Sequence, residues 1–258
     1  MAEEPDKENL AEGTLISHLL ELRNRLMRAM IAFVIALVPC IYYQNRLFTF
    51  VAEPLRQKLP KGDTLIATRV MSPFTTPLML AMFTAAFIAM PIILYQIWSF
   101  VAPGLYKREK RFAVPLLASS VLLFYVGVGF AYKVVFPVVF GYFVGTTPEG
   151  VKMTTDIADY LSFAIQMFFA FGLAFETPVA VVLLVLTGLV KIEKLRSNRG
   201  YVLVGVFIVS AAVTPPDAMS QCIMAIPMYA LYEGGLIMAS IMSNMRKKDA
   251  EEQDPAPS

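Results

Sequence analysis

Histidine, cysteine and charged side chains are scarce in this sequence of 258 residues, which contains one histidine, two cysteines and 16% charged residues. Zinc sites draw their ligands mainly from histidine and cysteine, so zinc ligation of any familiar spacing is excluded. A serine, histidine and aspartate arrangement is also unavailable in the apolar part of the chain, and there is no glycine-rich phosphate loop. We therefore expect neither an enzyme nor a metal or cofactor site.

Apolar residues make up 57% of the sequence, which is more than a soluble domain of this size needs. A helix of about 20 residues crosses the hydrocarbon layer of a bilayer, and the sequence offers six candidates. They run approximately over residues 26–43, 77–101, 112–140, 161–190, 201–213 and 221–241. This pattern predicts an all-α integral membrane protein with six transmembrane helices.

Basic residues gather before the first span and after the second, fourth and sixth spans. By the positive-inside rule, these segments and both termini are cytoplasmic. Residues 45–72 also carry basic residues, but we interpret them as one long external loop, which Pro54 and Pro60 make a stiff, irregular cap. The expected domains are a cytoplasmic tail (1–14), a transmembrane domain (15–243) and a disordered cytoplasmic tail (244–258).

The last two spans are predicted to be short. Arg199 and Pro215 are 16 positions apart, as are Asp217 and Glu233, and each distance corresponds to about 24 Å of helix. Either the membrane thins around this final hairpin or the charged ends are drawn inward. Alternatively, residues 234–241 continue the last span to full length, although this would not lengthen the fifth span.

Glu176 is the only acidic residue between Asp159 and Glu193, within an otherwise apolar run. A carboxylate at this depth is costly unless it is protonated, paired or facing water, so by default it marks a functional site. We predict an intramembrane polar site at Glu176.

Two further carboxylates lie on the predicted cytoplasmic side. Glu21 belongs to a predicted amphipathic helix before the first span, and Glu109 stands among four basic residues after the second span. Each has an ordinary explanation, since Glu21 can pair with Arg25 one turn later and Glu109 can belong to a plain surface loop. Together they could receive a ligand that carries cations followed by an apolar segment, as a targeting peptide does.

Four stretches of the sequence resemble the signature stretches of the TatC family, the multi-spanning subunits of the twin-arginine protein translocase. They read HLLELRNRL (18–26), FVAPGLYKREKR (100–111), FGLAFETP (171–178) and VTPPD (213–217). They occur in order on the six spans, and the resemblance covers roughly residues 15–240.

This resemblance implies the function of a receptor and core subunit that binds twin-arginine signal peptides. It would assemble with the single-span proteins TatA and TatB in the bacterial inner membrane, and it would export folded proteins with the proton-motive force. The implied shape is a glove-like bundle, and self-assembly, but no nucleic-acid partner, is expected.

The resemblance also implies roles for particular residues. Glu21 and Glu109 would contact the paired arginines, with Arg23 and Phe100 supporting that surface. Pro54 would be structurally important, Glu176 would line the concave face, and Asp217 and Gln221 would belong to the docking region for TatA and TatB.

Two other classes remain open on the residues alone. A proton-coupled small-solute transporter would use Glu176 beside Pro178 as its coupling site on a broken helix. However, we find no clear internal repeat of the kind that transporters usually show. A purely structural membrane scaffold would not need Glu176.

Overall fold

The structure is a computed structural model that describes residues 7–57, 65–101, 110–148, 154–214 and 217–253. This part of the chain is almost entirely helical, and its only β contact is one isolated bridge between Ile66 and Asp156. The helices are α1 (Lys7–Tyr42), α2 (Gln44–Arg56), α3 (Ser72–Val101), α4 (Lys110–Phe130), the π-helical turn η2 (Ala131–Val135), α5 (Phe136–Gly145), α6 (Ile157–Ala174), α7 (Thr177–Leu186), α8 (Ile192–Ser197), α9 (Arg199–Val213) and α10 (Ala218–Gln253).

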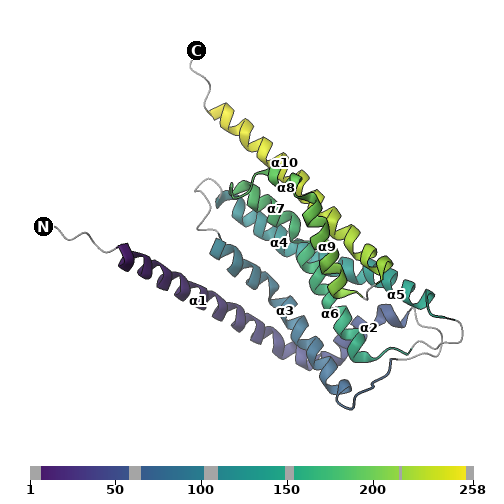
Figure 1. The fold of residues 1–258 in the computed structure, drawn as a ribbon. Coiled ribbons are helices and arrows are strands. Elements are labelled where there is room, and N and C mark those ends of the chain that lie inside the picture. The colour runs from purple at the N-terminus through teal and green to yellow at the C-terminus, as the bar shows by residue number, and fades with distance from the viewer. Residues whose placement is uncertain (1–6, 58–64, 102–109, 149–153, 215–216, 254–258) are drawn as a thin grey trace.

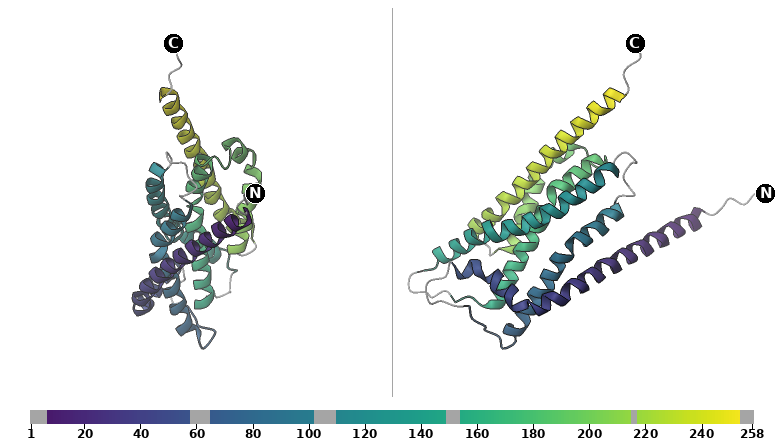
Figure 2. Two further views of the ribbon diagram at one scale, coloured as in Figure 1. Left: turned by 90° about the vertical axis from the view of Figure 1, so that its left-hand side faces the viewer. Right: turned by 180° about the vertical axis from the view of Figure 1, so that it is seen from behind.

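The long helices lie roughly side by side, with α1 and α3 at one edge and α10 at the opposite edge (Figures 1 and 2). At one end of the bundle α3 ends, α4 begins and α8 lies across the surface. We call it the basic end because α8 and its flanks carry Lys191, Lys194, Arg196 and Arg199. The other end, which we call the cap end, contains α2, α5 and the start of α6.

Five predicted spans correspond to helices that are long and apolar enough to cross a membrane. These are residues Leu19–Tyr42, Ser72–Ser99, Val114–Gly145, Ile157–Leu186 and Ala218–Met245. The remaining prediction corresponds to α9, which has 15 residues and so is about 22 Å long. Since the hydrocarbon layer is about 30 Å thick, α9 is the one short helix among these six.

The prediction of a short final hairpin holds for α9 but is wrong for α10. That helix has 36 residues and continues through Gly234 and Gly235. Gly235 packs so closely on α7 that an added Cβ atom would lie 2.8 Å from the Cα atom of Pro178. The helix also reaches Gln253, past the predicted start of a disordered tail at residue 244, because this stretch is rich in helix-forming Met, Lys, Ala, Glu and Gln.

Small residues bring α1 and α3 together. Ala36 and Cys40 of α1 are buried in one cluster with Ala81 and Ala85 of α3. Close approach at small residues is the usual way in which membrane helices associate, because the lipid offers no hydrophobic driving force. The large side chains of α1 mostly face outward, so α1 joins the bundle mainly through α3.

The predicted irregular cap begins instead with a regular helix, α2. Its apolar residues recur at helical spacing, so Val51, Ala52 and Leu55 are all buried against the aromatic core around Phe136 and Phe140. Pro54 did not prevent this helix from forming, and Pro60 lies outside the described residues.

Two prolines each free a helix carbonyl, and two tyrosines of the α4–η2 segment bind these carbonyls. Pro54 has no N–H to donate to Phe50, and the Tyr132 hydroxyl donates to the Phe50 carbonyl oxygen at 2.8 Å. In the same way, Pro91 in α3 has no N–H to donate to the carbonyl oxygen of Phe87, and the Tyr125 hydroxyl donates to that oxygen at 2.9 Å. The α4–η2 segment therefore holds both α2 and α3 by hydrogen bonds across the helices.

Asp156 ties the loop before α3 to the start of α6. Its carboxylate caps α6 by accepting from the Ala158 amide at 2.7 Å, and it also accepts from the amide and hydroxyl of Thr68 at 2.7 and 2.5 Å. The Ile66–Asp156 bridge adds two backbone hydrogen bonds, from Ile66 to Thr155 and from Ile157 to Ile66. The hydrogen bond from the Thr68 side chain, followed by the backbone bonds, lowers the pKa of Asp156 from 3.8 to about 2.

This lowered pKa predicts an acid-dependent opening of the cap end. A group whose pKa is depressed in the folded state stabilises that state at pH values above its ordinary pKa, and the contribution is lost as pH falls through the folded value. Hydrogen exchange at the Ile66 and Ile157 amides should thus lose protection between about pH 4 and pH 2. In Asp156→Asn, protection of these amides should be weaker at pH 7 and should not fall further between about pH 4 and pH 2. The control is Asp159→Asn, one turn later, in which the loss of protection between about pH 4 and pH 2 should remain. An unchanged profile in Asp156→Asn would contradict this role.

Candidate functional site

Glu21 lies in the N-terminal half of α1 and pairs with Arg25 one turn later. The Arg25 Nε atom donates to the Glu21 Oε1 atom at 3.1 Å, and an Nη atom makes a second contact with the same oxygen. This is the pairing that the sequence predicted as the ordinary explanation. The Glu21 side chain nevertheless stays 42% exposed, so a second cation can reach it. Arg23 is exposed.

Helix register places Glu21 at the height of the end of α3. The antiparallel helices α1 and α3 meet where Ala36 and Ala85 cluster, and both rise 1.5 Å per residue. Glu21 precedes Ala36 by the same number of residues by which Phe100 follows Ala85, so both lie about 22 Å toward the basic end. The Phe100 side chain and all of Glu109 lie outside the described residues. Glu109 directly precedes Lys110, the first residue of α4.

Glu176 lies at a break within the fourth predicted span. Phe175 and Glu176 form a turn between α6 and α7, and Pro178 at the start of α7 cannot donate a helical hydrogen bond to Ala174. Since α7 has 10 residues, Glu176 lies about 15 Å from the end of the span toward the basic end. The carboxyl group is thus at membrane depth.

Ser120 of α4 is the hydrogen-bond partner of Glu176. Its hydroxyl, on a residue that is 1% exposed, donates to the Oε2 atom of the carboxyl group. The other oxygen, Oε1, is buried and has no hydrogen-bond partner within the described chain. The site therefore has one unused hydrogen-bonding position. Ser120 was not predicted, although a serine in an apolar span is a signal that could have identified it.

Asp217 caps the start of α10 at the cap end. Its carboxylate accepts from the Ser220 amide at 2.8 Å and from the Ser220 hydroxyl, and its carbonyl accepts from the Gln221 amide at 3.2 Å. The Ser220 hydroxyl, followed by its amide, lowers the pKa of Asp217. Gln221 is half-buried one position after Ser220. The structure therefore brings Asp217 and Gln221 together in one helix cap.

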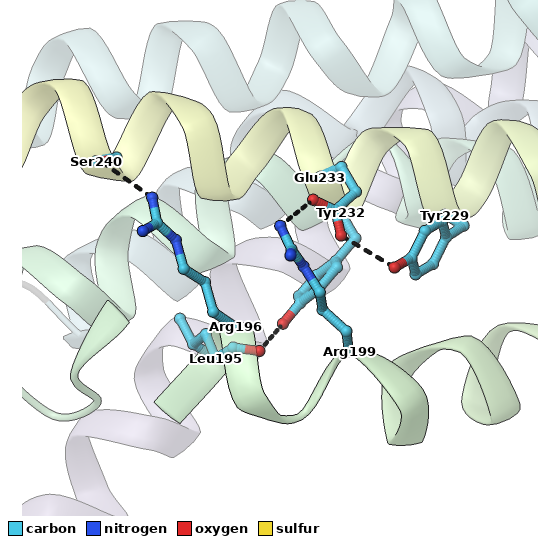
Figure 3. Close-up of polar contacts among 7 residues, drawn as sticks. All are labelled: Leu195, Arg196, Arg199, Tyr229, Tyr232, Glu233 and Ser240. Carbon is cyan, nitrogen blue, oxygen red and sulfur yellow. Dashed lines mark hydrogen bonds and ion pairs between the residues drawn. The ribbon is translucent and has the colours of Figure 1, made fainter. Parts of the chain in front are cut away.

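A polar cluster that the sequence did not predict joins α8 and α9 to α10 (Figure 3). The Arg199 guanidinium contacts the Glu233 carboxylate at 2.6 Å, and the Tyr229 hydroxyl donates to the same carboxylate at 3.0 Å. The Tyr232 hydroxyl donates to the Leu195 carbonyl oxygen at 2.8 Å. Glu233, the one acidic residue in the apolar part of α10, was the available signal.

Comparison of the whole chain with known proteins places it in a class of membrane transport proteins. The family model of "Sec-independent protein translocase protein (TatC)" matches residues 17–227. The chain is 51% identical over 225 residues to the Sec-independent protein translocase protein TatC of Escherichia coli K12, covering 87% of each chain. It is 47% identical over 256 residues to the protein of the same name from Azotobacter chroococcum, covering 99% of each.

The fold agrees with this result. A crystal structure described as the twin-arginine translocase receptor TatC superposes with a TM-score of 0.79 at 35% sequence identity, covering 88% of this chain and 99% of that one. The chain therefore belongs to the TatC family of protein translocase subunits. It is a multi-pass protein of the bacterial inner membrane. The alternative of a proton-coupled small-solute transporter is not supported by these relatives.

Proposed function

We propose that this chain binds twin-arginine signal peptides at its basic end, recruits TatA and TatB, and exports folded proteins with the proton-motive force. It binds and positions its partners and carries out no catalysis of its own. The proposed topology has both termini, including the tails 1–14 and 244–258, on the cytoplasmic side. Support for the receptor function comes from the crystal structure of the twin-arginine translocase receptor that this fold resembles. Support for the topology comes from the basic residues of α8 and its flanks.

The position of Glu21 is the observation that carries this proposal. Its carboxylate side chain is 42% exposed and lies at the height of Phe100, the residue before the last one of α3. A planar guanidinium matches a carboxylate with two parallel hydrogen bonds, and the ammonium of lysine does not. A peptide arginine would replace Arg25 as the partner of Glu21, so one guanidinium would exchange for another without burying a bare charge.

Removal of either carboxylate charge should weaken peptide binding. A charge-assisted hydrogen bond contributes about 1.5–3 kcal/mol, so Glu21→Gln and Glu109→Gln should each reduce crosslinking to a signal peptide about ten-fold or more. The control is Glu193→Gln, since Glu193 is an exposed carboxylate in α8 at the same end. Protein levels in the membrane should be equal in all three variants. Equal peptide binding in all three would remove Glu21 and Glu109 from the site.

The short helix α9 suits docking of a single-span partner such as TatA or TatB. Ser210 is its only buried residue, and Val204 and Ile208 are more than half exposed. If the membrane thins around α9, partners with short spans would gain by sharing that thinned region, and Asp217 and Gln221 lie at the cap end of the adjoining α10.

Disulfide crosslinking can test this docking surface with two equally exposed positions. Ile208 in α9 and Leu122 in α4 are both 65% exposed, so cysteines at these positions are equally accessible. Ile208→Cys should crosslink to a cysteine in the partner's span several times more strongly than Leu122→Cys does. Stronger crosslinking from Leu122→Cys would show that the partner docks elsewhere.

A further inference from the structure

A cavity of about 370 Å³ opens at the cap end between the starts of α3 and α6. Its polar lining comes from Arg69, Ser72, Thr75, Thr76 and Ser162. Its apolar lining includes Met79, which lies farther along α3 than Ser72, Thr75 and Thr76, and Leu161, which is next to Ser162 on α6. On its α3 side the cavity is therefore polar near Arg69 and apolar at Met79, which we call its apolar floor.

Two hydroxyl groups that line this cavity have no hydrogen-bond acceptor within the described chain. Ser72 and Thr76 are both only 3% exposed, and neither hydroxyl forms a hydrogen bond within the described chain. By contrast, the hydroxyls of Thr75 and Ser162 already donate to the carbonyl oxygens of Met71 and Ala158, so they remain as acceptors.

Arg69 adds a positive charge at the mouth of the cavity. It is exposed and makes no ion pair with a described residue. Asp156 and Asp159 are the acidic residues at the start of α6, but neither lines the cavity. Asp156 is occupied by Thr68 and by the first turn of α6. An arginine beside free hydroxyl donors, with no carboxylate among the described residues that line the cavity, is suited to an anion, and a guanidinium fits a phosphate bidentately.

The depth of the cavity identifies the kind of anion. Ser72 and Ile157 are the first residues of two membrane spans, so the cavity lies where the hydrocarbon layer begins. This is the level at which a phospholipid carries its phosphate. Next to Arg69, Val70 is 96% exposed and Met71 is 62% exposed, which is consistent with a segment that lies against lipid.

We propose that this cavity binds the phosphodiester head group of a phospholipid in the leaflet at the cap end. Arg69 pairs with the phosphate, Ser72 and Thr76 donate to its oxygens, and Met79 and Leu161 contact the first part of an acyl chain. The bound lipid joins the starts of α3 and α6, which are otherwise linked at this end through Asp156 and the Ile66 bridge. This site is separate from the peptide-binding end and does not depend on the proposed function.

Native mass spectrometry of the full chain in detergent, with added phosphatidylglycerol, tests the proposal. Arg69→Gln should weaken lipid binding about ten-fold. Thr76→Val, which keeps the side-chain shape but removes the hydroxyl, should weaken it several-fold. Arg56→Gln, at an exposed arginine of α2 at the same end, is the control and should bind like the unmodified chain. If Arg69→Gln and Arg56→Gln have equal effects, the proposal is wrong.

Two further probes separate a lipid from a free anion. Diacylglycerol lacks the phosphate, so it should bind equally weakly to the unmodified chain and to Arg69→Gln. Inorganic phosphate at millimolar concentration should not displace the lipid, because it cannot occupy the apolar floor. Complete displacement by phosphate, or equal binding of diacylglycerol and phosphatidylglycerol, would overturn the assignment to a phospholipid.

Discussion

Gly127→Leu is expected to force α4 away from α6 and to lower the free energy of unfolding by about 3 kcal/mol. A Cβ atom on Gly127 would lie 2.5 Å from the carbonyl oxygen of Phe171 and 2.9 Å from the Cβ atom of Phe175. The crossing is reciprocal, because a Cβ atom on Gly172 of α6 would lie 2.6 Å from the ring of Phe124 in α4. Backbone atoms cannot move aside as a flexible side chain can, so the two helices must separate.

The two cysteines offer a direct readout of this loss of packing. Cys40 is buried and Cys222 is half-buried, so a thiol-reactive dye reports their exposure as the protein is heated. The control is Gly129→Leu on the same helix, since nothing lies within 4 Å of a Cβ atom at Gly129. The midpoint temperature of unfolding should fall by several degrees for Gly127→Leu and stay close to that of the unmodified chain for Gly129→Leu. Equal midpoints for the two variants would contradict the close crossing of α4 and α6.

Changes at Glu176 are expected to impair export in an order set by hydrogen bonding. Glu176→Gln can still accept from the Ser120 hydroxyl and should retain much of the activity. Glu176→Ala leaves Ser120 without its partner and removes the free position at Oε1, so export should fall about ten-fold. Glu176→Lys introduces a cation at a depth where it costs about 3 kcal/mol, and export should fall about 100-fold.

The matched pair Ser119 and Ser120 checks this explanation. Ser120→Ala removes the donor to Glu176, whereas Ser119 is exposed and bonds only to the Pro115 carbonyl of its own helix. Export of a folded reporter protein should drop in Ser120→Ala and remain normal in Ser119→Ala. An inactive Gln variant beside an active Ala variant at position 176 would exclude the hydrogen-bonding role.

The spans could be predicted from the sequence because hydropathy alone decides which segments enter a bilayer. Where the helices end depends on packing, which the sequence does not display. Glu233 suggested a charged end to the last span, yet α10 continues past it, and Gly235 is the point at which α10 fits against Pro178 of α7. The prolines of the cap suggested irregular structure, but Tyr132 binds the carbonyl that Pro54 leaves free, so α2 remains helical. Such contacts join residues far apart in the chain.

In the candidate site, too, features that depend on neighbouring residues in the sequence were predicted, and contacts between helices were not. Glu176 was predicted because a lone carboxylate in an apolar run is costly, whereas Ser120, its partner from another helix, was not. The pairing of Glu21 with Arg25 follows from helical spacing and was predicted. The height of Glu21 relative to Phe100 required the register of α1 against α3, which Ala36 and Ala85 set.

Binding of a signal peptide with paired arginines, compared with the same peptide carrying paired lysines, tests the central claim most directly. The full chain in nanodiscs would be titrated with each labelled peptide at the same ionic strength. If Glu21 and Glu109 recognise guanidinium groups, the arginine peptide should bind about ten-fold or more tightly than the lysine peptide, and Glu21→Gln should shrink that difference. Equal affinity for both peptides, unaffected by Glu21→Gln, would contradict the claim that this end of the protein is a twin-arginine receptor.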